Sequence, residues 1–334
     1  MKRLPFPHIE PAIWQIPVLV LIQALFAYAF NIAGWKVDPV TFFFIPLIFA
    51  ILFWKERSFK IIADYLGFNT KNITQKILAS IAGICIGISL YLLLKYGVGS
   101  IISPFTSWTI PVSLPGESVI YNVLENMPVI LFFIVLVFTG IYAVTGKVPV
   151  KGLIAVFLAL LIPFILSNLT PGLVLNLIIG YGEELLCLIF AMIAINWLIY
   201  RYNLKYNDIK THVAAWTISR AAWAVIHAVG VYNTIMAYIM AFILGMVFTA
   251  IGYMFWFGTI GGIIMLLIGL FDIYLYFTQG LLISLVCGVT LITIGGFLLM
   301  EPHLLRDESL KFKEYVIYGP AFAHAFYDYA FLVL

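Results

Sequence analysis

Long apolar runs separated by short polar segments make up most of the chain. A helix needs about 20 apolar residues to cross the hydrocarbon core of a bilayer. By that measure the sequence predicts about eleven membrane spans. The expected spans are residues 12–33, 39–54, 77–98, 124–146, 151–169, 172–200, 212–232, 234–256, 259–277, 279–300 and 314–334. The predicted fold class is therefore all-α, a polytopic transmembrane helical bundle, because helices satisfy their own backbone groups in lipid.

Basic residues between the spans predict the orientation of the bundle. With the N-terminus in the cytoplasm, every Lys and Arg except Lys36, Lys95 and Arg220 falls in a cytoplasmic segment or beside one. Short cytoplasmic loops carry an excess of Lys and Arg, so the sequence predicts N-in and, with an odd number of spans, C-out. Only Thr278-Gln279-Gly280 divides the ninth and tenth spans. Merging them would move the basic segment 301–313 outside, which favours two separate spans.

Composition supports a membrane protein and excludes some partners. The chain is 64% hydrophobic and 10% charged, whereas soluble domains carry about 25% charged residues. We expect a multi-pass protein of the cell membrane that contacts membrane lipids. The net charge of +3 is small and sits in short loops, so no nucleic acid is expected as a partner. Within the third span, Gly83-x-x-x-Gly87 permits another helix to approach closely.

A few ionisable residues lie inside the expected spans and form the candidate site. A charge at the bilayer centre costs about 2.5–3.5 kcal/mol on insertion scales, so such residues are functional candidates by default. Glu183 and Glu184 are adjacent in the sixth span. The others are Arg220, His227, Asp272, His324 and Asp328. Helical spacing places Arg220 and His227 on one face with Trp223, and His324 on one face with Asp328. We expect the acidic pair and the two imidazoles to meet around one pocket of water.

Three short motifs carry a resemblance to a known family. Glu183-Glu184, Trp223-x-x-x-His227 and His324-x-x-x-Asp328 lie on separate expected spans. In this order they resemble the motifs of the type II CAAX prenyl protease and bacteriocin-processing family, which are glutamic intramembrane proteases. The resemblance covers roughly residues 172–334 and predicts two domains. Residues 1–170 would hold N-terminal transmembrane helices of unknown role, and residues 171–334 a CAAX-protease-like domain with an inserted hairpin near 259–300.

The resemblance implies an intramembrane endopeptidase that hydrolyses a peptide bond of a membrane-bound or prenylated substrate with a glutamate-activated water. Glu183 would be the general base, with Glu184 in the same catalytic set, and His227 would hold the water. His324 and Asp328 would stabilise the oxyanion. An ionised Asp only accepts hydrogen bonds, so Asp328 would be protonated or would orient His324 instead.

The resemblance also implies that Arg220 and Trp223 lie beside the catalytic residues or the substrate. No cofactor is expected. Zinc bound by two histidines and a glutamate is chemically feasible and ranks second.

Other functions remain open at this stage. The family motif carries an Arg four residues after the Glu pair, where this chain has Leu188, so the chain would be a divergent member. Arg220 could replace that cation from the next helix. The departure favours a catalytically inactive membrane scaffold or chaperone of the same fold. A proton-coupled transporter with a Glu and His relay is a further alternative. An aspartyl intramembrane protease using Asp272 and Asp328 is another, although its motifs are not matched.

Overall fold

The structure, a computed structural model, describes residues 4–32, 64, 67, 71–98, 173–227 and 235–333. Within these ranges all regular secondary structure is helical and no strand is present. The elements are α1 (Gln15–Ile32), α4 (Ile73–Leu92), the π-helix η2 (Leu93–Val98), α8 (Leu173–Tyr202), α9 (Ile209–His227), α10 (Ile235–Met254), α11 (Gly258–Gln279), α12 (Leu282–Met300) and α13 (Tyr318–Val333). The predicted all-α class is confirmed for this part of the chain.

Several of these helices have the length and composition of membrane spans. Among the described residues, four stretches are helical and apolar enough to cross a bilayer: Ile73–Gly97, Ile179–Tyr202, Gly258–Gln279 and Leu282–Met300. A shorter apolar helix covers Tyr238–Met254. These features are typical of a membrane protein. The expected spans 39–54, 124–146 and 151–169 lie outside the described residues, so the total of eleven and the N-in, C-out orientation stay predictions.

The ninth and tenth expected spans are two helices, as the charge pattern predicted. α11 ends at Gly280, whose backbone is left-handed with φ 68° and whose N–H donates to the carbonyl of Tyr276. Glycine adopts this conformation without a Cβ clash and so commonly terminates helices. α12 begins two residues later, at Leu282.

The last helix begins later than the apolar run suggested. The expected span started at residue 314, whereas α13 starts at Tyr318. Pro320 explains this start, because proline has no N–H and its ring clashes with the carbonyl four residues before it. Proline is tolerated in the first turn of a helix, where it lies here.

The described helices belong to two compact units that interleave along the chain. The first unit contains residues 1–62, 116–171 and 185–247, and the second contains residues 63–115, 172–184 and 248–334. α8 therefore contributes Glu183 and Glu184 to the second unit and its following residues to the first. The predicted division at residue 170 stays a prediction.

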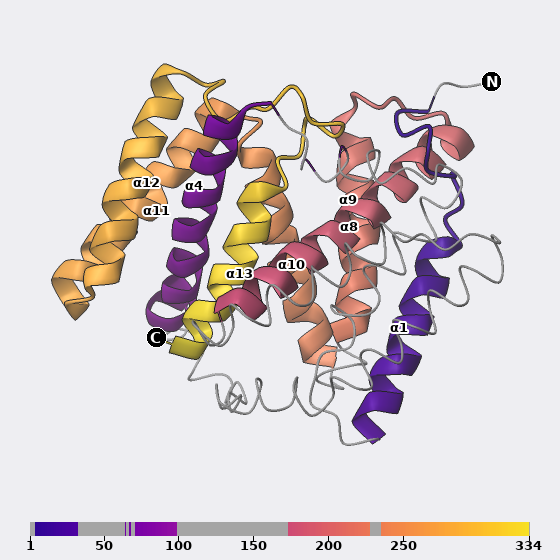
Figure 1. The fold of residues 1–334 in the computed structure, drawn as a ribbon, viewed down its shortest axis with the longest axis horizontal. Coiled ribbons are helices and arrows are strands. Elements are labelled where there is room, and N and C mark those ends of the chain that lie inside the picture. The colour runs from indigo at the N-terminus through magenta and orange to yellow at the C-terminus, as the bar shows by residue number, and fades with distance from the viewer. Residues whose placement is uncertain are drawn as a thin grey trace. The chain divides into compact units, whose positions relative to one another are not determined.

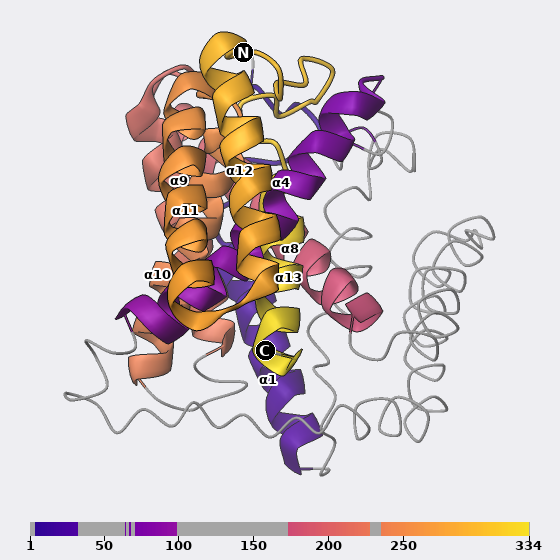
Figure 2. The same cartoon turned by 90° about the vertical axis from the view of Figure 1, so that its left-hand side faces the viewer.

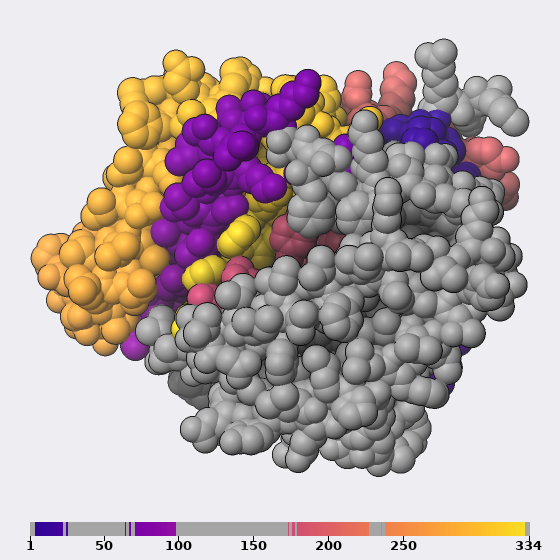
Figure 3. Space-filling model, in the orientation of Figure 1, coloured from indigo at the N-terminus to yellow at the C-terminus, as the bar shows by residue number. Residues whose placement is uncertain are grey.

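In the second unit, α11 and α12 form an antiparallel hairpin (Figures 1 and 2), and α4 runs beside it (Figure 3). Glycines bring the two hairpin helices together. A Cβ built on Gly269 would lie 2.8 Å from the carbonyl oxygen of Gly288, and one on Gly288 would lie 2.9 Å from that of Gly269. Backbones therefore touch at this level, as is common between membrane helices. A hairpin is present where the resemblance placed one, and its description as an insertion stays a prediction.

Close backbone contacts also position α13, which carries His324. The Gly83-x-x-x-Gly87 motif of α4 faces α13, and a Cβ on Gly87 would collide with the carbonyl of Ala323. On the other side, a Cβ on Gly180 of α8 would lie 2.5 Å from the backbone nitrogen of Ala325. The close helix approach predicted for the α4 motif is thus confirmed. It holds α13 near the residues of α8 that precede the acidic pair.

In the first unit, a buried amide attaches the segment before α1 to α8. The Nδ2 group of Asn196 donates to the carbonyls of Phe6 and Ile9, both at 2.7 Å. The N–H of Phe6 lies 3.4 Å from Oδ1 of the same Asn196. α1 also packs against α9. The segment is therefore held by its backbone groups as well as by apolar contacts.

Candidate functional site

The acidic pair is enclosed within the protein. Glu183 is 2% exposed and Glu184 is fully buried. Neighbouring residues of an α-helix point about 100° apart, so the two carboxylates have different surroundings. Burying a carboxylate is costly unless it is paired or hydrogen-bonded. Their partners therefore show how each buried carboxylate is stabilised.

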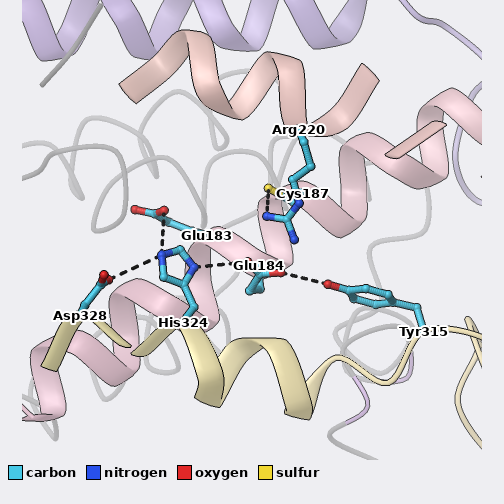
Figure 4. Close-up of polar contacts among 7 residues, drawn as sticks. All are labelled: Glu183, Glu184, Cys187, Arg220, Tyr315, His324 and Asp328. Carbon is cyan, nitrogen blue, oxygen red and sulfur yellow. Dashed lines mark hydrogen bonds and ion pairs between the residues drawn. The ribbon is translucent and has the colours of Figure 1, made fainter. Parts of the chain in front are cut away.

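Both oxygens of Glu184 have a hydrogen-bonding group beside them. The hydroxyl of Tyr315 donates to Oε2 at 2.9 Å. On the other side, Nδ1 of His324 lies 3.2 Å from Oε1 (Figure 4). Glu184 thus links α8 to α13 and to the segment that leads into α13. Hydrogen bonds to a charged group contribute about 1.5–3 kcal/mol each, so this link is a strong one.

The second nitrogen of the His324 ring faces two further carboxylates. Nε2 lies 3.7 Å from Oε2 of Glu183 and 3.5 Å from Oδ2 of Asp328, which is one turn along α13. Figure 4 shows both carboxylates directed at the ring. Phe248 stacks on the imidazole ring, with 4.4 Å between centroids and 17° between planes. We call Glu183, Glu184, Tyr315, His324 and Asp328 the carboxylate–histidine network.

The network is closed at one end and partly open at the other. Glu184 and Tyr315 are fully or almost fully buried, and His324 is 4% exposed. The side chain of Asp328, by contrast, is 31% exposed. The network is therefore accessible from outside the protein on the side of Asp328.

The number of N–H groups on the His324 ring determines how many of the surrounding carboxylates it can hydrogen-bond. A neutral imidazole has one N–H, whereas the doubly protonated ring can donate from both nitrogens. The doubly protonated ring would donate to Glu184 from Nδ1 and to the other two carboxylates from Nε2. The Nε2 contacts are ion-pair distances, longer than ordinary hydrogen bonds. Catalytic hydrogen bonds are often long in the free enzyme and shorten when substrate binds.

The predicted Arg220 and Trp223 form a cluster in the first unit. Arg220 is fully buried, and its Nη1 donates to Sγ of Cys187 at 3.1 Å (Figure 4). Its guanidinium lies 5.4 Å from the ring centroid of Trp216 and 5.7 Å from that of Trp223. The contact with Cys187 joins α9 to α8, whereas both tryptophans lie on α9 with Arg220. A role for Arg220 as a substitute for the family cation stays a prediction.

Another candidate is placed only by its backbone. His227 is the last residue of α9, and its side chain lies outside those that the structure describes. Of the two imidazoles expected at the acidic pair, His324 lies beside both glutamates, while the part assigned to His227 stays a prediction. Leu188, which stands where the family has Arg, is buried in α8.

Two residues of the site were not found by sequence reasoning. Tyr315 lies between α12 and α13, just before α13 begins, and Phe248 lies in an apolar run of α10. A useful signal for Tyr315 was available, because a tyrosine that becomes buried usually finds a partner for its hydroxyl. No sequence feature distinguishes Phe248 from the other aromatic residues of its helix.

Metal binding was the second-ranked alternative. Among the described residues, no group of three or more His, Cys, Asp or Glu side chains is arranged to hold a metal ion. Zinc ligation by His227 and His324 with a glutamate cannot be built from the described side chains, because that of His227 is not among them. It therefore stays a prediction.

Comparison of the chain with protein-family models, with curated proteins and with solved structures finds no match. The resemblance to CAAX-type proteases therefore rests on the motifs alone and stays a prediction.

Proposed function

We propose that the protein is an intramembrane endopeptidase of the glutamate type, which hydrolyses a peptide bond of a membrane-bound or prenylated substrate. The observation that supports it is the buried carboxylate–histidine network, in which Glu183, Glu184, His324 and Asp328 come together from α8 and α13. Buried ionisable groups clustered in this way are typical of catalytic sites. The eleven-span bundle, with its N-in orientation in the cell membrane, belongs to the same proposal.

The two glutamates have different roles in this proposal. Glu184 accepts hydrogen bonds from Tyr315 and His324, so it fixes the orientation of the imidazole. Glu183 faces Nε2 of the ring, together with the partly exposed Asp328. Glu183 is therefore the general base, on the side from which water and substrate arrive.

The proposed reaction is a direct hydrolysis. Glu183 takes a proton from water while the water oxygen bonds to the carbonyl carbon of the substrate. The N–H at Nε2 of His324 donates to the oxyanion that forms. The C–N bond then breaks, Glu183 passes its proton to the leaving amine, and the products are a carboxylic acid and an amine. Asp328 orients the ring, since an ionised carboxylate cannot donate to the oxyanion. In this scheme His227 keeps its predicted role in holding the water.

The test is peptide cleavage by the full chain reconstituted in lipid vesicles. The substrates are a transmembrane peptide and a peptide with a prenylated C-terminus. Loss of a general base lowers the rate by about 10²–10⁴-fold, and Glu183→Gln is expected to fall in that range. Glu301→Gln, an exposed glutamate at the end of α12, is the matched control and should cleave like the parent. A Glu183→Gln variant as active as the parent would rule out the base assignment.

A membrane scaffold or chaperone is the second candidate, and one observation favours it. Glu184 is fully buried and hydrogen-bonded at both oxygens, as expected of a structural tie between helices. In that case the parent protein cleaves neither peptide. Glu184→Gln would still lower thermal stability, because the tie would be weakened. The two functions therefore differ in cleavage by the parent, whereas both predict the loss of stability.

A further inference from the structure

A second buried carboxylate lies in the second unit, on the α11–α12 hairpin. Asp272 of α11 is fully buried. α12 makes room for it, since a Cβ built on Gly288 would lie 3.1 Å from the Cβ of Asp272. Among the described residues, the Ser89 hydroxyl of α4 contacts Asp272, and the Cys85 thiol of α4 and the Cys287 thiol of α12 interact with it electrostatically. None of them belongs to a basic residue.

The contacts of this carboxyl are few. Ser89 Oγ lies 2.5 Å from Oδ2 of Asp272 and 2.6 Å from the backbone carbonyl oxygen of Cys85. In the part of the chain that the structure describes, Oδ1 of Asp272 has no hydrogen-bonding partner. Both short contacts of the hydroxyl are therefore to oxygen atoms, and both must contain a hydrogen.

The single hydroxyl hydrogen of Ser89 can be assigned to one of its two short contacts. A serine hydroxyl has one hydrogen to donate, and a backbone carbonyl can only accept. The hydrogen of Ser89 therefore serves the Cys85 carbonyl, the usual bond of a serine within a helix. If Asp272 were ionised, its Oδ2 and the Ser89 oxygen would be two acceptors 2.5 Å apart with no hydrogen between them. A proton on Oδ2 resolves the conflict, because the acid then donates to Ser89.

The other oxygen of Asp272 leads to the same conclusion. An ionised carboxylate shares its negative charge between both oxygens, and a buried charge without a partner is very costly. In the neutral acid, Oδ1 is an ordinary carbonyl oxygen, for which a missing partner costs much less. The unpartnered Oδ1 and the crowded Ser89 hydroxyl thus independently favour the protonated form.

We propose that Asp272 is a proton-binding site inside the membrane. With the proton bound, Asp272 donates a hydrogen bond to Ser89, and Ser89 donates one to the Cys85 carbonyl. These hydrogen bonds connect the α11–α12 hairpin to α4. When the proton leaves, Asp272 and Ser89 become competing acceptors and the contact opens. α4 also packs on α13 through Gly87, so this proton supports the same helix that positions His324. The proposal does not depend on the peptidase function.

Infrared spectroscopy of the full chain in lipid vesicles at neutral pH tests this site. A protonated carboxylic acid gives a carbonyl stretching band that a carboxylate lacks. The expected result is a band of this kind in the parent that is lost in Asp272→Asn. The amide of the variant can still donate to Ser89, so its thermal stability should stay close to that of the parent. Ser89→Ala should shift the band, because the acid loses its hydrogen-bond acceptor.

A control variant shows whether the band responds to Ser89 specifically. Ser284→Ala removes another buried hydroxyl, one that donates to the Leu281 carbonyl of the same hairpin region, and should leave the band unchanged. If Asp272→Asn fails to fold, the test is whether Ser89→Ala shifts the carbonyl stretching band. Spectra of the parent and Asp272→Asn that coincide in this region, or a parent band that Ser89→Ala does not move, would overturn the proposal.

Discussion

Glu184 is fully buried, and its polar contacts include the Tyr315 hydroxyl at Oε2 and the His324 ring at Oε1. Removing one donor from a buried acceptor costs about 1–3 kcal/mol, because the group stays desolvated without compensation. The stability of this part of the protein therefore depends on both donors. Tyr315 is the better one to test, since its ring can be kept while its hydroxyl is removed.

We expect Tyr315→Phe to lower the free energy of unfolding by about 1–3 kcal/mol and to slow peptide cleavage. The measurement is the thermal midpoint in detergent, followed by the cleavage rate. Tyr202→Phe is the matched control, because Tyr202 is exposed at the end of α8. Equal midpoints for Tyr315→Phe and its control would show that the hydroxyl does not hold Glu184.

Asn196 gives a second prediction at the level of one residue. Asn196→Ala leaves the backbone groups of Phe6 and Ile9 without the amide that binds them. The expected loss is at least about 2 kcal/mol, because several buried polar groups lose their partner together. The thermal midpoint measures it, with Asn207→Ala, at an exposed position of the α8–α9 connection, as control. A midpoint like that of the control would contradict the role given to Asn196.

Among the helices, α13 depends on neighbours that leave no room for side chains. α4 meets it at Gly87 and α8 meets it at Gly180. These contacts fix the distance between helix axes, and through it the distance between Glu184 and His324. A change in helix packing is therefore expected to alter the network even when the substituted residue is remote from it.

Gly87→Val tests this dependence. The added side chain would collide with the backbone of Ala323, and overpacking of this kind typically costs about 1–3 kcal/mol. We expect a lower thermal midpoint together with slower peptide cleavage. Gly296→Ala on α12 is the control, since a Cβ there meets nothing within 4 Å. Normal cleavage by a folded Gly87→Val protein would show that the network does not depend on this helix contact.

The helices were largely predictable from sequence, and their contacts only in part. Apolar runs gave the bounds of α8 and α12 to within a few residues, because membrane helices must satisfy their backbone internally. The start of α13 was missed because Pro320 lies within an otherwise apolar segment. The approach of His324 to Glu184 followed from the motifs. Tyr315 was missed because it is distant in sequence from Glu184, and pairing at such separations depends on three-dimensional packing.

At the scale of the whole molecule, the membrane topology (the number of spans and the side on which each end lies) is predicted by the sequence. The described residues do not test it. The distribution of Lys and Arg predicts an odd number of spans, with the N-terminus in the cytoplasm and the C-terminus outside. A fluorescent reporter that folds only in the cytoplasm should be bright when fused before Met1 and dark when fused after Leu334. Fluorescence from both fusions would require an even number of spans.

The central claim is that Glu183 and His324 act together on one reacting group. A double-mutant cycle on the rate of peptide hydrolysis in vesicles tests it most directly. Residues that act as a unit are strongly non-additive in catalysis. We predict that the double variant, Glu183→Gln with His324→Gln, is no slower than the slower of the two single variants. Losses that multiply, or single variants that cleave as fast as the parent, would contradict the claim.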